Sequence, residues 1–145
     1  MSIERRIFLQ RTVAASAVGV ALSAGLLIPR AVVAAWPKAA FKARDVNTVL
    51  SELMGGTDVA DSADIKLKAP DIAENGAVVP LTTATTMAGV KHMLVLVEKN
   101  PAVLVAQFNP TDMVEANFAV RAKMGQSSDV YAVAIMNDGK AYFAK

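Results

Sequence analysis

Residues 90–97, with the sequence VKHMLVLV, decide the fold class of this chain. The stretch is apolar on both faces, which predicts a central strand that is covered on both sides. A second stretch of the same kind, VYAVAIM at residues 130–136, is followed directly by Asn137-Asp138-Gly139. Because Asp-Gly is typical of a tight hairpin, we expect the chain to turn there into a further strand over residues 140–145.

Further strands are expected before residue 90 and between the two apolar stretches. Residues 65–69 alternate between apolar and charged side chains, and residues 77–86 are rich in Val and Thr, with Pro80 favouring an edge position or a bulge. Residues 103–108 and 116–124 complete the set. Turn residues separate these segments and no helix interrupts them, so the chain is predicted to be mainly β. The expected fold is an immunoglobulin-like antiparallel β-sandwich of about six or seven strands.

One short amphipathic helix is expected before the sandwich, over residues 41–54. Its apolar residues recur at three- and four-residue spacing, and Gly55-Gly56 ends it. We expect this apolar stripe to pack against the sandwich. The predicted organisation is therefore an export signal at 1–35, a helix and connector at 36–62, and the sandwich at 63–145.

The N-terminus has the layout of a twin-arginine export signal. The consensus residues are Arg5, Arg6, Phe8 and Leu9. A charge-free run of 17 residues follows, and small residues before residue 36 offer a cleavage site. The alternative is a transmembrane anchor, but a bilayer core needs about 20 apolar residues. We therefore expect export to the periplasm and no stable membrane insertion.

The basic character of the chain is concentrated in this signal. The whole sequence has a net charge of +2 and a pI of about 9.0. Residues 1–35 hold four arginines and one glutamate, so the remainder has one more acidic than basic residue. This balance argues against nucleic acid or an anionic membrane as a partner.

The sequence offers little catalytic chemistry. It contains no cysteine and only one histidine, His92, which we interpret as a partly buried strand residue. The carboxylates Asp58, Asp61 and Asp64 recur every three residues and could in principle supply oxygen ligands to calcium. The segment that holds them lacks the glycine and the distal glutamate of a known calcium loop. The methionines are scattered, as is typical of core filling. We therefore predict no catalytic residue, no cofactor and no metal site, with a periplasmic metal-binding sandwich as a remaining alternative.

Residues 65–80, with the sequence IKLKAPDIAENGAVVP, resemble the SoxY family. Further matches are VEKNP at 97–101, RAKM at 121–124 and SDVYAV at 128–133. The resemblance implies an immunoglobulin-like sulfur-carrier subunit of the periplasmic thiosulfate-oxidising (Sox) system, which is not an enzyme. It also implies a heterodimer with a SoxZ-type sandwich subunit and transient contacts with other Sox enzymes.

The family carries its sulfur on a C-terminal Gly-Gly-Cys-Gly-Gly arm, which the 145 residues do not contain. We expect a sequence truncated in the last strand, which would leave residues 131–136 without a neighbour, expose an apolar edge and lower the stability. The alternative is a cysteine-free paralogue that acts as a structural or regulatory binder of the SoxZ-type subunit.

Overall fold

The computed structural model describes residues 36–145. The expected export signal, with Arg5, Arg6, Phe8 and Leu9, lies outside the described residues. Residues 36–145 form one compact unit. In this part of the chain, no helix has the length and apolar character needed to cross a membrane.

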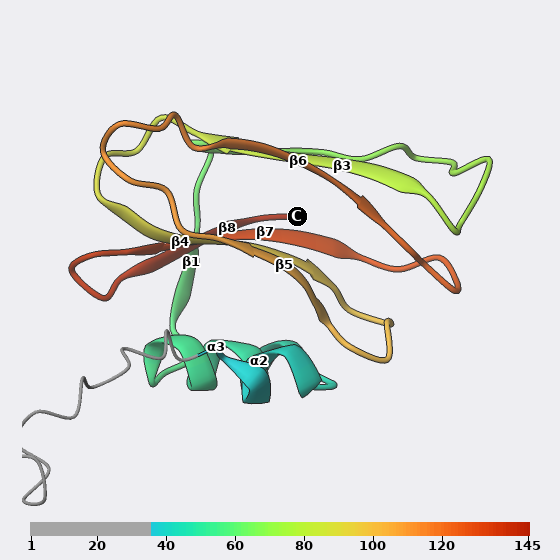
Figure 1. Ribbon diagram of the computed structural model, residues 1–145, viewed down its shortest axis with the longest axis horizontal. Coiled ribbons are helices and arrows are strands. Elements are labelled where there is room, and N and C mark those ends of the chain that lie inside the picture. Colours follow the sequence, from blue (N-terminus) through green and yellow to red (C-terminus); the bar gives the residue numbers. More distant parts are fainter. Residues whose placement is uncertain (1–35) are drawn as a thin grey trace, which may run out of the picture. The chain divides into compact units, whose positions relative to one another are not determined.

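Two β-sheets lie face to face, which confirms the predicted mainly β sandwich (Figure 1). One sheet has five strands in the order β1-β8-β7-β4-β5, and the other has three in the order β2-β3-β6. The strands are β1 Val59–Asp61, β2 Ile65–Lys68, β3 Val79–Thr85, β4 Val90–Val97, β5 Leu104–Phe108, β6 Asn117–Ala122, β7 Val130–Met136 and β8 Ala141–Ala144. The described residues therefore contain eight strands, not the expected six or seven.

The two apolar stretches that predict the fold form the middle of the larger sheet. β4 pairs antiparallel with β7, from Val90 opposite Met136 to Val97 opposite Val130. β4 also pairs with β5, and β7 pairs with β8, so both strands have neighbours on each side. The predicted hairpin is present, and Gly139 has the positive φ of 87° that its turn requires.

The single helix expected over residues 41–54 is two helices, α2 Lys38–Lys42 and α3 Val46–Met54. The chain is extended at Asp45, with φ −143° and ψ 155°. Its side chain accepts a hydrogen bond of 2.8 Å from the amide of Thr48. Asp45 is therefore the N-cap of α3, and its extended backbone is the physical reason why a continuous helix is wrong.

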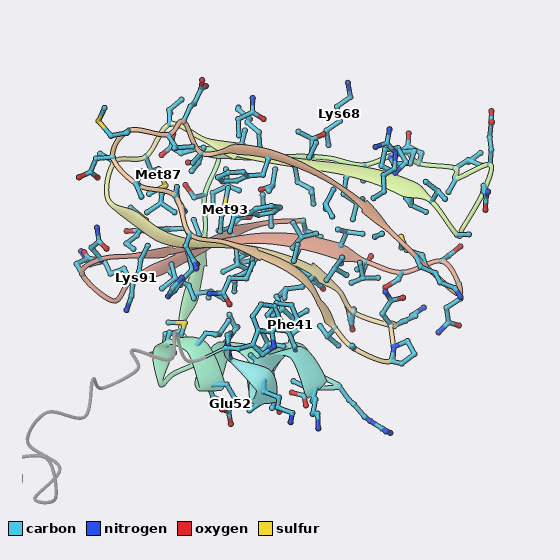
Figure 2. All side chains as sticks on the ribbon, in the orientation of Figure 1. Phe41, Glu52, Lys68, Met87, Lys91 and Met93 are labelled. Carbon is cyan, nitrogen blue, oxygen red and sulfur yellow. The ribbon has the colours of Figure 1, made fainter. Side chains whose placement is uncertain are left out.

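The helices cover the outer face of the five-stranded sheet. The buried side chains Val49 and Leu50 of α3 belong to one cluster with Leu94 and Leu96 of β4. Figure 2 shows Phe41 on the side of the helices that faces the sheet and Glu52 on the side that faces away from it. This packing confirms the expected role of the apolar stripe.

A second core fills the space between the sheets. Met93 and Val95 of β4 and Leu81 of β3 are at most 1% exposed. The rings of Phe108 and Phe118 stack with their centroids 4.4 Å apart and so join β5 to β6. The large sheet is therefore packed on both faces, as its apolar central strands require.

The N-terminal strand β1 lies in the segment expected to be a connector. It runs parallel to β8, with Val59 opposite Ala141 and Asp61 opposite Phe143. β8 in turn pairs with β7 over four residues, from Ala132 to Ile135. The expected unpaired edge beside residues 131–136 is therefore wrong for most of that strand, because β8 covers β7 and β1 covers part of β8.

Pro80 lies in β3, the middle strand of the small sheet, and not in an edge strand. The pairing between β2 and β3 ends where Lys68 lies opposite Thr82. At Pro80, only Arg121 of β6 is opposite. One side of β3 is thus locally free of a partner strand, which is the environment that a proline without an amide hydrogen requires.

Candidate functional site

The only histidine of the sequence lies in a small polar network of β4 and β5. The Nδ1 atom of His92 is 2.7 Å from Oδ1 of Asn109. The side-chain nitrogen Nε2 of Gln107 donates a hydrogen bond of 3.0 Å to the same oxygen. His92 is half-buried. This position in β4 and the hydrogen bond to Asn109 confirm the interpretation of His92 as a partly buried strand residue.

The three aspartates of the segment before β2 are not brought together as ligands. Asp61 lies in β1, and Asp64 precedes β2, where its backbone carbonyl accepts a hydrogen bond of 3.0 Å from Oγ1 of Thr85. Among residues 36–145, no group of three or more His, Cys, Asp or Glu side chains is arranged to hold a metal ion.

An open groove of about 720 Å³ lies at one end of the sandwich. Leu67, Val79 and Leu81 of the small sheet line it together with Val130 of β7. Its polar rim includes Ser127, Ser128, Asp129 and Lys145. Figure 1 shows the loop between β2 and β3 and the loop between β6 and β7 at this end of the two layers.

A polar cluster holds Lys145 at the rim of this groove. Its Nζ is 2.8 Å from Oδ2 of Asp129 and 5.7 Å from the centre of the Tyr131 ring. The hydroxyl of Tyr131 donates a hydrogen bond of 3.0 Å to Oε2 of Glu98. The cluster therefore ties the end of β8 to β7 and to the segment after β4.

The pKa values of Lys145 and Tyr131 are both raised in this cluster. The hydrogen bond and charge of Asp129 raise the pKa of Lys145, because they favour the charged ammonium. Partial burial, followed by the hydrogen bond to Glu98, raises the pKa of Tyr131, because both favour the neutral phenol. Both groups keep their protons to higher pH in the folded chain than in the unfolded one.

The loop that forms one wall of the groove is fixed at its base. The amide of Met124 donates a hydrogen bond of 2.7 Å to the carbonyl of Gly76, and a Cβ atom at Gly76 would lie 2.7 Å from the carbonyl oxygen of Met124. Only glycine allows this close approach of two backbones. The loop then presents Ile72, which is 86% exposed. The family-like stretch at 65–80 thus builds a docked loop with an exposed apolar tip.

The outer face of the small sheet carries a second surface feature. The exposed side chains Lys66 and Lys68 lie on β2, and Arg121 lies on β6. Between them are the small uncharged side chains of Thr82, Ala84 and Ala119. We call these six residues the basic face.

Sequence reasoning missed the groove and the basic face. The alternation of Lys66 and Lys68 indicates one wet side of a strand, but nothing in the sequence places Arg121 on the same side of the same sheet. That juxtaposition follows from the strand order β2-β3-β6. The contact between Lys145 and Asp129 likewise depends on the pairing of β7 with β8.

A family model and a solved structure both match this chain to SoxY. Residues 50–145 match the family model described as sulfur oxidation protein SoxY. The fold resembles a solved structure, the sulfur carrier protein SoxY from Chlorobium limicola f thiosulfatophilum, with 30% identity and a TM-score of 0.63 over 76% of this chain and 95% of that one. A superoxide reductase (neelaredoxin) from Ignicoccus hospitalis is more distant, with 14% identity and a TM-score of 0.45 over 55% and 74% of the two chains. No curated protein matches.

Proposed function

The chain belongs to the SoxY family of sulfur oxidation proteins, and from this premise we propose that it is a sulfur-carrier subunit of a Sox thiosulfate-oxidising system. SoxY proteins are carriers and not enzymes. The observation that carries the proposal is the family match over residues 50–145, to which the sandwich and its loops belong.

The residue that binds sulfur is not among the 145 residues, because they include no cysteine. We propose that the native protein continues beyond Lys145 into a cysteine-bearing, glycine-rich arm. The resemblance of residues 65–80 to the family supports this proposal, because the family carries its sulfur on such an arm. Flexible glycines in such an arm would let its tip reach the active sites of other proteins.

We further propose that the protein acts in the periplasm as a heterodimer with a SoxZ-type subunit. The support is the twin-arginine pattern at Arg5 and Arg6, together with the family membership. A twin-arginine route carries folded proteins, so a partner without its own signal would cross together with this chain.

The intact mass of the native protein, purified from its own cells, tests the carrier role. We expect a chain that begins near residue 36, contains one cysteine after residue 145 and loses mass on reduction, because the reductant removes bound sulfur. Alkylation after reduction counts the cysteine. A sample alkylated without reduction is the control, because a loaded thiol does not react.

A native chain without any cysteine would contradict this proposal. It would favour the second candidate function, a structural or regulatory binder of the SoxZ-type subunit, for which the observation is the cysteine count of zero. Such a chain would bind the partner without a change of mass on reduction.

A further inference from the structure

The two outer faces of the sandwich differ in whether helices cover them. Helices α2 and α3 cover the five-stranded sheet. In the part of the chain that the structure describes, no element lies over the outer face of the three-stranded sheet (Figure 1). This sheet face is therefore open to solvent.

The strand register fixes the arrangement of the basic face. Lys68 lies opposite Thr82, which lies opposite Ala119. Lys66 lies opposite Ala84 in the neighbouring row. Since directly opposed residues of an antiparallel sheet point to the same side, the two rows form a flat centre of small side chains. Neighbouring strands are about 4.8 Å apart, so the lysines of β2 and the arginine of β6 flank this centre on either side.

The charge of the face is unbalanced. The outward positions of the three strands include three basic side chains and no Asp or Glu. The whole of residues 36–145, by contrast, has one more acidic than basic residue. The ion pairs within the described residues join Lys140 to Asp138 and Lys145 to Asp129, and so leave the basic face uncompensated. Figure 2 shows Lys68 projecting away from the sandwich.

We propose that the basic face docks a protein partner through a flat surface that carries carboxylates. A flat sheet face with small central side chains allows a second sheet to pack closely, and the flanking cations select an acidic partner over a basic one. The inference rests on the proposed function, because it assigns this surface to the partner subunit of the Sox assembly.

The test measures binding of the purified SoxZ-type subunit to the mature protein by isothermal titration. The variant is Lys68→Glu combined with Arg121→Glu, which reverses charge on both sides of the face. We expect the Kd to rise about 10- to 100-fold. Higher salt should weaken the wild-type complex and have less effect on the variant, because exposed charges are screened.

The matched control is Lys91→Glu combined with Lys38→Glu. Both lysines are exposed and lie outside the basic face, on β4 and α2, so the change in total charge is the same. We expect this control to bind within about twofold of the wild type. Thermal melts establish that both variants fold. If the charge-reversed variant does not fold, the neutral pair Lys68→Gln and Arg121→Gln should still weaken binding.

Several results would overturn the proposal. The first is equal binding by the variant and the wild type, and the second is equal weakening by the control. The third is aggregation of the variant with an unchanged affinity for the SoxZ-type subunit. This result would mean that the charges only prevent the edge strands β2 and β6 from pairing with other chains. Binding of the wild type to phosphatidylglycerol vesicles but not to the protein partner would also overturn it. A native protein that carries sulfur but does not bind the partner would reject the docking surface and leave the carrier role intact.

Discussion

Thr83 places a polar hydroxyl in the apolar space between the two sheets. It is 0% exposed between the two sheets, and its hydroxyl has no hydrogen-bond partner among the described residues. An unpaired buried hydroxyl costs about 1–3 kcal/mol relative to the same group in water. The neighbouring Thr82 points to the opposite side of β3 and is half-buried.

Thr83→Val should therefore stabilise the protein, because the two side chains have nearly the same shape. We expect the free energy of unfolding to rise by about 1 kcal/mol, measured by urea denaturation. Thr82→Val is the matched control and should change it by less than about 0.5 kcal/mol. A loss of stability in the Thr83 variant would show that the hydroxyl has a bonding partner in solution.

The cluster at the end of β8 predicts a loss of stability at alkaline pH. The pKa values of Lys145 and Tyr131 are both raised by folding, so the unfolded chain loses these protons first. Their contribution is complete below the unfolded values of about 10 and is lost as the pH rises through the folded values. Thermal melts between about pH 8 and pH 11 should show a Tm that begins to fall only as the pH approaches about 10.

Tyr131→Phe should make this alkaline fall shallower, because it removes one of the two shifted groups. Tyr142→Phe is the matched control, since Tyr142 lies outside the cluster in β8. Equal slopes for the two variants would exclude a role for the hydrogen bond between Tyr131 and Glu98.

At the scale of elements, Asp45 decides where α3 begins. Its carboxylate accepts hydrogen bonds from both the amide and the hydroxyl of Thr48, at 2.8 Å and 2.6 Å. The hydrogen bonds lower the pKa of Asp45, with the Thr48 hydroxyl as the largest cause. The helical layer therefore depends on a cap that works best when it is ionised.

Asp45→Ala should lower the Tm at pH 7, and Asp45→Asn should lower it less, because an amide oxygen can still accept the bond. A lowered pKa means that the stabilisation is present above the unfolded value of about 3.9 and is lost as the pH falls. The difference between wild type and Asp45→Ala should therefore shrink towards pH 2. Asp58→Ala, an exposed carboxylate outside the helices, is the control.

The elements that the sequence predicts correctly are those with strong local patterns. β4 and β7 are continuous apolar runs, and the hairpin between β7 and β8 has its own turn residues. β1 was not predicted, because three residues are too few for an alternating pattern and its stability comes from β8, far away in the sequence. The same reason applies to the surfaces, since the groove and the basic face combine residues from distant strands.

At the scale of the whole molecule, two cores share one sheet. Leu50 packs between α3 and the outer face of the large sheet, and Leu81 packs between the two sheets. β4 contributes to both cores, with Leu94 in one and Val95 in the other. The helices and the sandwich should therefore unfold together.

Leu50→Ala and Leu81→Ala should each lower the free energy of unfolding by about 2–5 kcal/mol, because each leaves a cavity in a closed core. Calorimetry should show one transition in both variants, shifted to lower temperature. Leu53→Ala is the control for the helix, and it should cost less because Leu53 is only half-buried. Two separate transitions in either variant would mean that the helical layer is an independent unit.

The pairing of β1 with β8 also affects how the protein is made. Residues 59–61 can complete their sheet only after residues 141–143 have left the ribosome. Until then the helices have no finished surface to cover, and the nascent chain exposes apolar strands for most of its synthesis. Folding is therefore completed only after translation of the last strand, and the growing chain is a natural client for chaperones that bind extended apolar segments.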